Sequence, residues 1–252
     1  MRHYGLIGKH LSHSFSANFF RVKFQNESID ADYNLIEIDD ISTIRDVVVE
    51  RELSGFNVTI PYKESIIPYL DELTEEATAV GAVNCVVVRN GRLVGYNTDI
   101  TGIEASLEWL DIDINARALI LGTGGASKAV QYVCRKYNLA YDIVSRNIER
   151  GDYTYDSLNT EVISQHTLII NATPVGMSPN KEEAPSLPYT ALGAEHKVFD
   201  LIYNPATTQL LNRAKEQGAT TMNGILMLQT QAIASWHIWQ KAYEEFKEGN
   251  AC

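Results

Sequence analysis

A lysine and an aspartate at the ends of two polar runs are the residues best suited to chemistry in this sequence. Lys63 ends the run NVTIPYK at residues 57–63, and Asp99 ends the run NTD at residues 97–99. Each run places amide, hydroxyl and charged groups next to an apolar segment, where side chains can converge on a small polar ligand. Because an ammonium and a carboxylate tune one another's proton affinity, the pair is suited to acid–base catalysis. The alternative is a surface salt bridge between two loops.

A glycine-rich turn, LGTGGASKA at residues 121–129, separates a predicted buried strand at 118–121 from a predicted helix at 128–136. This is the context of a dinucleotide phosphate-binding loop. Gly122 permits a tight turn, and Gly124 allows backbone N–H groups at the helix N-terminus to approach a pyrophosphate. The third glycine directly follows the second, which departs from G-x-G-x-x-G. An ordinary structural turn is the alternative.

The next predicted strand, residues 141–145, is followed by an arginine where an NAD-binding unit usually carries an acid. A carboxylate there would repel a 2′-phosphate, whereas a guanidinium binds a phosphate bidentately. Arg146 therefore favours NADP over NAD. The alternative is a solvated arginine at the end of a strand.

These motifs lie within an alternating pattern of strands and helices. Hydrophobic periodicity predicts strands at 3–8, 33–38, 55–60, 83–88 and 92–96, with helices at 16–26, 41–50 and 63–70. Asn90-Gly91 is a strong hairpin signal between the last two strands. After a helix at 100–110, a second series follows, with strands at 118–121, 141–145, 168–171 and 197–201 and helices at 128–136, 207–217 and 224–247. The pattern predicts two α/β domains.

Composition limits the class of protein. The 252 residues are 45% hydrophobic and 21% charged, as in a soluble globular protein of one large or two ordinary domains. The net charge of −11 argues against nucleic acid and anionic membranes as partners. No apolar run approaches the roughly 18 residues of a membrane span, and the N-terminus lacks a signal peptide. Three cysteines without metal-ligand spacing, Cys85, Cys134 and Cys252, predict reduced thiols in a cytoplasmic protein with no metal.

Taken in order, the motifs resemble those of the shikimate dehydrogenase family over essentially the whole chain. SHSFS at 12–16 resembles the family's S-x-S motif, although Ala17 stands where a proline is usual, and residues 57–63 resemble N-V-T-x-P-x-K. Further similar motifs are GAVN at 81–84, GYNTD at 95–99, GTGGA at 122–126, NATPVGM at 171–177, DLIYNP at 200–205 and the segment 224–231.

The resemblance implies an α/β fold of two αβ domains. The substrate-binding catalytic domain is expected at 1–99 plus 224–252, and a Rossmann-like NADP-binding domain at 100–223, with the C-terminal helix returning to the first domain. The implied activity is the reversible NADPH-dependent reduction of 3-dehydroshikimate to shikimate in aromatic amino-acid (chorismate) biosynthesis, by a cytoplasmic monomer or homodimer whose partner is this small molecule. We expect Lys63 and Asp99 to line an interdomain cleft that closes on binding.

The same resemblance assigns roles to individual residues. Lys63 and Asp99 are the expected catalytic pair, with Lys63 polarising the substrate carbonyl and donating a proton. Expected substrate contacts are Ser14, Ser16, Asn57, Thr59, Lys63, Asn84, Asp99, Tyr203 and Gln231. Expected cofactor contacts are Gly122, Thr123, Gly124, Gly125, Ala126, Ser145, Arg146, Thr173, Leu201 and Gly224. On their residue types alone, Ser14 and Ser16 are also candidates for helix caps, and Asn84 for an ordinary turn residue.

Three other functions compete with this one. A quinate/shikimate dehydrogenase would use quinate and often NAD, which Arg146 argues against. Another NADP dehydrogenase with two similar domains, such as a methylenetetrahydrofolate dehydrogenase, would lack the S-x-S and N-T-D motifs. A regulator that binds shikimate or quinate without turnover would have no need of both Lys63 and Asp99.

Overall fold

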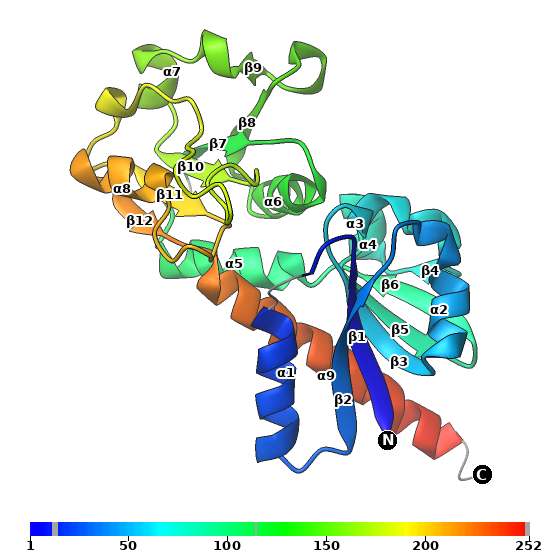
Figure 1. The fold of residues 1–252 in the computed structure, drawn as a ribbon. Helices are drawn as coiled ribbons and strands as arrows, with labels where there is room; N and C mark the ends of the chain where they lie inside the picture. The colour runs from blue at the N-terminus through cyan, green and yellow to red at the C-terminus, as the bar shows by residue number, and fades with distance from the viewer. Residues whose placement is uncertain (12–14, 114, 250–252) are drawn as a thin grey trace. The chain divides into compact units, whose positions relative to one another are not determined.

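The computed structural model describes residues 1–11, 15–113 and 115–249, which divide into two compact α/β units (Figure 1). Unit 1 comprises Met1–Thr98 and Ala232–Cys252, and unit 2 comprises Asp99–Gln231. The predicted fold class is therefore confirmed. Of the helices in the described ranges, none is long and apolar enough to cross a membrane.

Unit 1 is built on a mixed six-stranded sheet in the order β2-β1-β3-β5-β6-β4. Its strands are β1 (Arg2–Gly8), β2 (Ala31–Glu37), β3 (Leu53–Val58), β4 (Glu72–Leu73), β5 (Cys85–Arg89) and β6 (Arg92–Tyr96). Its helices are α1 (Phe15–Asn26), α2 (Ile44–Glu50), α3 (Tyr62–Ser65) and α4 (Glu75–Val80), with 3-10 turns η1 (Ile41–Thr43) and η2 (Ile67–Tyr69). β1 pairs in parallel with β2 and β3, while β5 runs antiparallel to β3 and β6.

Both faces of this sheet are covered by apolar side chains. Because side chains alternate along a strand, Ile7 of β1 packs on one face and Tyr4 on the other. The first face buries residues of α2 and α3, such as Ile44 and Tyr62. The second face buries Phe20 of α1 among other aromatic rings. Burial on both sides explains the apolar run Cys85–Val88 in β5.

The second face is completed by the C-terminal helix α9 (Ile225–Gly249), which begins in unit 2 and continues into unit 1. Trp236 and Trp239 are 1% and 2% exposed, and the Trp239 ring stacks on Tyr4 with 4.6 Å between ring centroids. The Trp239 indole N–H donates to the Val86 carbonyl at 3.0 Å. A side chain at Gly55 would lie 2.5 Å from that indole nitrogen, so the glycine makes room for the ring.

Unit 2 contains a second six-stranded sheet, in the order β12-β11-β10-β7-β8-β9, in which every pair is parallel. Its strands are β7 (Arg117–Leu121), β8 (Ala140–Ser145), β9 (Tyr153–Thr154), β10 (Leu168–Asn171), β11 (Lys197–Asp200) and β12 (Thr220–Met222). Its helices are α5 (Asp99–Trp109), α6 (Gly125–Lys136), α7 (Thr160–Ser164) and α8 (Gln209–Glu216), with 3-10 turns η3 (Ile148–Arg150), η4 (Tyr155–Ser157) and η5 (Tyr189–Ala191). A parallel sheet aligns the carboxyl ends of its strands along one edge.

Candidate functional site

The strand order of unit 2 creates a topological switch point beside β7. From β7 the chain proceeds outward through β8 and β9, then returns to β10 on the opposite side of β7 and proceeds outward again. Open parallel sheets bind ligands outside the carboxyl ends of the strands at such a point. All of the expected cofactor residues lie at this edge: the glycine loop follows β7, Ser145 ends β8, and Thr173, Leu201 and Gly224 follow β10, β11 and β12.

The glycine loop has the geometry needed to receive a phosphate. Gly122 has φ +105, and a side chain there would lie 2.8 Å from Thr173 Cγ2, so this position requires glycine. Gly124 is the N-cap of α6, and a side chain built on it would meet nothing within 4 Å. The space in front of the helix N-terminus is therefore open. The first N–H groups of a helix have no intrahelical partner and carry its positive dipole end, so the residues present fit a dinucleotide pyrophosphate.

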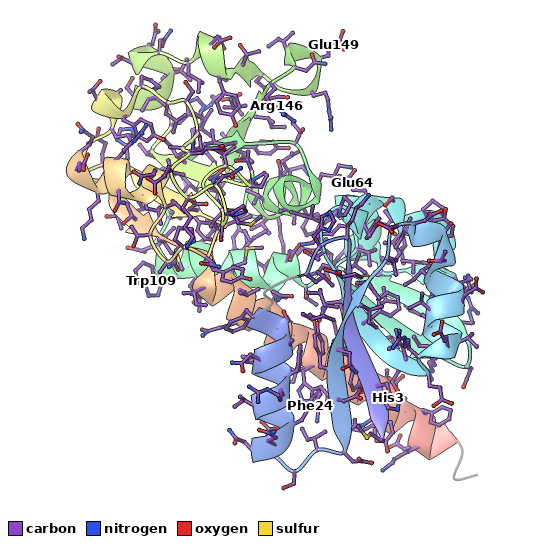
Figure 2. All side chains as sticks on the ribbon, viewed as in Figure 1. His3, Phe24, Glu64, Trp109, Arg146 and Glu149 are labelled. Carbon is purple, nitrogen blue, oxygen red and sulfur yellow. The ribbon has the colours of Figure 1, made fainter. Side chains whose placement is uncertain are left out.

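The segment after β8 presents Arg146, which is exposed and lies beyond the strand end (Figure 2). A local turn shapes this segment: the Ser145 hydroxyl accepts from the Asn147 amide at 3.2 Å, and Asn147 Oδ1 accepts from the Glu149 amide at 3.0 Å. Burial raises the pKa of Tyr155, and the positive charge of Arg146 opposes that rise. The charge of Arg146 therefore lies close to Tyr155 of η4.

The turns after β10, β11 and β12 are tied together by backbone contacts. The Leu201 amide donates to the Asn171 carbonyl, and the Gly224 amide donates to the Ile202 carbonyl, both at 3.0 Å. A side chain at Gly224 would lie 2.0 Å from the Leu201 carbonyl oxygen, which requires glycine there. Residues that the family resemblance places beside the nicotinamide therefore belong to one hydrogen-bonded layer.

In unit 1, two of the expected substrate residues take part in one buried network. Asn57 and Asn84 are 4% and 3% exposed. Asn84 Oδ1 accepts from the Thr98 amide at 2.7 Å, and its Nδ2 donates to the Thr98 hydroxyl at 3.0 Å. Asn57 Nδ2 donates to the Asn84 carbonyl at 3.0 Å and to the Ser235 hydroxyl at 2.9 Å. Both amide hydrogens of Asn57 are thus used inside the unit, as expected of a group that positions its neighbours.

The network continues toward α1 through a buried tyrosine. The Tyr33 hydroxyl donates to Asn57 Oδ1 at 2.9 Å and interacts with the Ser16 side chain. Burial raises the pKa of Tyr33 well above its ordinary value, so this hydroxyl stays protonated. Ser16 is 7% exposed and lies in the first turn of α1, so the structure brings Ser16, Asn57 and Asn84 together. Ser14 lies outside the described residues.

Lys63 and Thr59 flank the turn that links β3 to α3. The Tyr62 amide donates to the Thr59 carbonyl at 2.9 Å, and the Lys63 carbonyl accepts from the Val83 amide at 2.7 Å. This second bond joins the Lys63 motif to the GAVN motif containing Asn84. Lys63 itself is half-buried in α3.

The remaining expected substrate residues belong to unit 2. Asp99 is 3% exposed and opens α5, directly after Thr98 of the unit 1 network. A carboxylate in the first turn of a helix is favoured by the helix dipole. Tyr203 is half-buried after β11, and Gln231 is 8% exposed in α9. The pairing of Lys63 with Asp99 stays a prediction.

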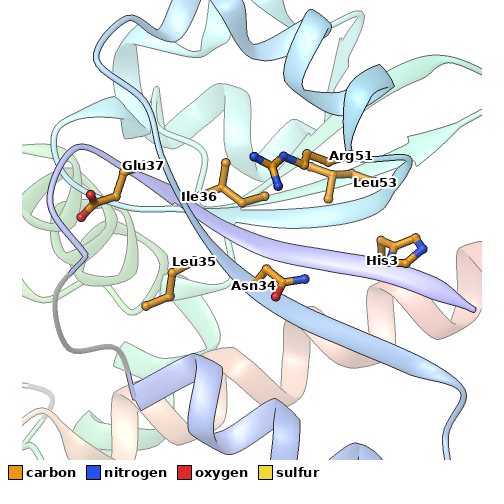
Figure 3. A pocket seen from close by; sticks show the side chains of 7 residues that line it. All are labelled: His3, Asn34, Leu35, Ile36, Glu37, Arg51 and Leu53. Atoms are coloured by element: carbon orange, nitrogen blue, oxygen red, sulfur yellow. The ribbon is translucent and has the colours of Figure 1, made fainter.

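A hollow of about 370 Å³ elsewhere in unit 1 is lined by described residues that include none of the expected site residues (Figure 3). Its lining comes from the strands β1, β2 and β3 and from Arg51: His3, Asn34, Leu35, Ile36, Glu37, Arg51 and Leu53. Glu37 Oε1 accepts from the Leu11 amide at 2.6 Å. These lining residues belong to neither the acid–base motifs nor the phosphate motif.

Sequence reasoning missed the hydrogen bonds that hold the unit 1 network in place. Thr98, Ser235 and Tyr33 are buried, and each bonds to Asn57 or Asn84. Thr98 lies in the NTD run at residues 97–99, which the sequence does single out, and Ser235 is a polar residue in a long, largely apolar helix. Its hydroxyl lies 3.1 Å from the Thr98 hydroxyl, which links α9 to the segment before Asp99.

Comparison with known proteins identifies the family. A model of the shikimate dehydrogenase substrate binding domain matches residues 6–86. Shikimate dehydrogenase (NADP(+)) from Methanococcus maripaludis is 38% identical, over 93% of this chain and 90% of that protein. Shikimate dehydrogenase 1 from Peptoclostridium difficile has a crystal structure with a TM-score of 0.84 and 34% identity, covering 98% of this chain and 97% of that one. The Thermus thermophilus enzyme, solved with NADP(H) and shikimate, has a TM-score of 0.84 and 29% identity, covering 95% of this chain and 93% of that one. The chain belongs to the shikimate dehydrogenase family.

Proposed function

We propose that this chain is an NADP-dependent oxidoreductase that interconverts 3-dehydroshikimate and shikimate. The observation that carries the proposal is that the chain combines both members of the acid–base pair, Lys63 and Asp99, with a parallel-sheet edge built for a dinucleotide. A binding protein without turnover has use for the second feature but not for the first. Relatives named shikimate dehydrogenase (NADP(+)) support the same activity.

The dinucleotide is assigned to the edge of unit 2. The Gly122–Ala126 loop and the N-terminus of α6 hold the pyrophosphate, and Arg146 with Ser145 holds the adenosine 2′-phosphate. The turns carrying Thr173, Leu201 and Gly224 form the nicotinamide side. NADPH supplies the hydride when it is bound, and the chain supplies orientation and the proton.

The proton chemistry is assigned to the charged pair. The Lys63 ammonium polarises the substrate ketone and donates a proton to its oxygen, and the neutral amine accepts that proton in the reverse direction. Asp99 accepts a hydrogen bond from a ring hydroxyl and fixes the orientation of the substrate.

The substrate contacts divide by the hydrogen-bonding capacity of each side chain. Ser14 and Ser16 are assigned to the substrate carboxylate, and Thr59, Asn84, Tyr203 and Gln231 to the ring hydroxyls. Asn57 already donates both amide hydrogens to Asn84 and Ser235, so we assign it to holding Asn84 in position.

The proposal is tested by measuring NADPH and NADH oxidation with 3-dehydroshikimate, and NADP⁺ and NAD⁺ reduction with shikimate and with quinate. We expect turnover of 3-dehydroshikimate with NADPH, and a kcat/KM with NADH lower by at least about tenfold, since a guanidinium on a phosphate contributes on the order of 1.5–3 kcal/mol. Faster reduction of NAD⁺ with quinate than of NADP⁺ with shikimate would replace this function with quinate oxidation. Ligand binding without turnover would indicate a regulator.

The proposal also includes a cytoplasmic location and a monomeric or homodimeric assembly. Cys85 and Cys134 are free and buried, as is usual in a reducing compartment, which supports a cytoplasmic enzyme. The expected monomer or homodimer is distinguished by light scattering on the purified protein.

A further inference from the structure

A buried carboxyl group that the proposed mechanism does not use bonds to the turns that carry the expected nicotinamide contacts. Asp200 is the last residue of β11, and its side chain is 0% exposed. Its Oδ1 accepts from Asn171 Nδ2 at 3.0 Å and from the Ile202 amide at 3.1 Å. Its Oδ2 accepts from the Thr208 hydroxyl at 2.6 Å. All three donors are neutral groups, so these hydrogen bonds bring no positive charge to the carboxyl group.

Each donor extends to one of the turns at this edge. Asn171 uses its Oδ1 to accept from the Thr173 amide at 3.1 Å and from the Thr173 hydroxyl at 2.7 Å. Ile202, whose amide Asp200 holds, follows Leu201 and accepts from the Gly224 amide at 3.0 Å. Thr208 is the N-cap of α8. One carboxylate therefore connects the turns after β10, β11 and β12.

A neutral residue of the same shape would avoid the cost of burying a charge, which hydrogen bonds from neutral donors offset only in part. Burial raises the pKa of Asp200 to about 6, against the effect of its three hydrogen bonds. The nearby ionisable groups are Tyr189 of η5, whose pKa burial raises to about 12, and Arg213 of α8, whose guanidinium lies 5.2 Å from the centroid of the Tyr189 ring. Asp200 is thus ionised at neutral pH and becomes neutral in mild acid.

We propose that ionised Asp200 is a positioning residue for the nicotinamide end of the dinucleotide, acting through Asn171 and Ile202 on Thr173, Leu201 and Gly224. Hydrogen bonds to an ionised acceptor are roughly twice as strong as neutral ones, so the charge tightens three turns at once. The inference rests on the proposed function for the identity of the dinucleotide, and it adds a residue that touches neither cofactor nor substrate.

The test separates the two ends of the dinucleotide by comparing NADP⁺ with 2′-phospho-ADP-ribose, which lacks only the nicotinamide. In Asp200→Asn, the shape and the Oδ1 acceptor remain but the charge is lost. We expect its Kd for NADP⁺ to rise about tenfold, while its Kd for 2′-phospho-ADP-ribose stays within about twofold of wild type. The quantity to follow is the ratio of the Kd for NADP⁺ to the Kd for 2′-phospho-ADP-ribose. In the wild-type protein this ratio rises as pH falls through about 6, and in Asp200→Asn it is independent of pH. The 2′-phosphate is common to both ligands, so its own titration cancels in the ratio.

A second pair of variants keeps the test informative if Asp200→Asn folds poorly. Thr208→Val removes one donor to the carboxylate and should raise the ratio about threefold, whereas Thr208→Ser keeps the hydroxyl and should restore it. Asp142→Asn is the matched control: it removes a carboxylate of the same sheet, one that Arg117 and His166 contact at 2.6 and 2.7 Å. The ratio should not change in this control.

Two results would overturn the inference. One is an equal loss of affinity for both ligands in Asp200→Asn and Thr208→Val, which indicates a purely structural role. The other is a pH-dependent ratio that persists without the carboxylate. The binding measurement is independent of turnover, so a wild-type protein that binds NADP⁺ but does not reduce 3-dehydroshikimate refutes the proposed function and leaves the role of Asp200 decided by the ratio.

Discussion

Lys63 is the residue on which the proposed chemistry depends most directly. Lys63→Ala should lower kcat by about 10²–10⁴-fold, the usual contribution of a general acid, with a modest change in the KM for 3-dehydroshikimate. Steady-state kinetics with saturating NADPH measure both parameters. Lys241→Ala, which removes an exposed lysine of α9 in the same unit, is the control and should behave as wild type. Near-normal turnover in Lys63→Ala contradicts the catalytic assignment.

Lys63→Arg separates the two roles that a lysine can play here. A guanidinium keeps the positive charge but does not give up a proton at neutral pH. Retention of most of the activity would therefore assign Lys63 to electrostatic stabilisation of the transition state. Loss of activity as large as in Lys63→Ala would assign it to proton donation.

The positions of Asn57 and Asn84 could be predicted from their motifs, but their bonding partners could not. Ser235 lies 178 residues from Asn57 in the sequence, and its place in an apolar helix is equally compatible with a solvent-facing serine. Short motifs identify residue types at fixed local spacing. A hydrogen bond between distant elements depends on how the helix rotates against the sheet, which local patterns do not encode.

Among the elements, those with strong local signals were predicted well. The Asn90-Gly91 turn joins β5 and β6 as an antiparallel hairpin, and the C-terminal helix spans Ile225–Gly249 against a predicted 224–247. The segment 41–50 was expected to be one helix but begins as the 3-10 turn η1. The helix expected at 63–70 ends at Ser65, and η2 follows with Pro68 in its first turn, since proline removes a backbone donor.

Short elements had no recognisable period and were missed. α4, α7, β4, β9 and β12 are two to six residues long, too short for amphipathic alternation to stand out. β12 matters for the site because it sets the position of Gly224. Tertiary pairing with β11 determines this strand, with Thr220 opposite Lys197.

Alanine at Gly124 should weaken NADP⁺ binding with little effect on stability, whereas alanine at Gly102 should lower stability. At Gly124, the N-cap of α6, the added methyl group meets nothing, so the free energy of unfolding should change by less than about 1 kcal/mol. That methyl group stands where the pyrophosphate is expected, and the Kd for NADP⁺ should rise at least about tenfold. At Gly102 in α5, the methyl carbon would lie 2.5 Å from the Met227 carbonyl oxygen in α9, and the overpacking should cost about 1–3 kcal/mol.

Urea unfolding and NADP⁺ titration of both variants measure these two effects. The Gly124→Ala prediction fails if affinity is unchanged in a stably folded protein. The Gly102→Ala prediction fails if the urea midpoint does not move, because the two backbones would then have separated without cost.

At the scale of the whole molecule, the chain passes between its two units twice. The first passage falls between Thr98 and Asp99, and the second between Gln231 and Ala232 inside α9. The sequence placed the second boundary at 224, where the helix begins, because Gly224 is the visible break in the pattern. Contacts instead assign the first turns of α9 to unit 2 and the rest to unit 1, a division that no local signal marks.

The free energy of unfolding should depend on pH in a way that reveals the buried carboxyl group of Asp200. Asp200 has a folded-state pKa raised to about 6 by burial, from an ordinary value of 3.8. A raised folded-state pKa means that the contribution of Asp200 to the free energy of unfolding is fully present below the unfolded-state pKa and is lost as pH rises through about 6. The difference between these pKa values corresponds to about 3 kcal/mol. Asp142 acts in the opposite sense, because the hydrogen bond from Arg117 lowers its pKa and its contribution is lost as pH falls.

Urea unfolding from about pH 4 to 7.5 in wild type, Asp200→Asn and Asp142→Asn distinguishes the contributions of the two residues to the free energy of unfolding. Relative to wild type, Asp200→Asn should gain up to about 3 kcal/mol of stability as pH rises across this range, because only the wild type must keep a charge buried. Relative to wild type, Asp142→Asn should be less stable by a nearly constant amount across this range, because the lowered pKa of Asp142 means that its contribution is lost only below the ordinary value of 3.8. A parallel pH dependence in wild type and Asp200→Asn would mean that the carboxylate is not buried as a charge. If Asp200→Asn is more stable than wild type yet binds NADP⁺ more weakly, then Asp200 lowers the stability of the fold while it positions the turns after β10, β11 and β12 for binding.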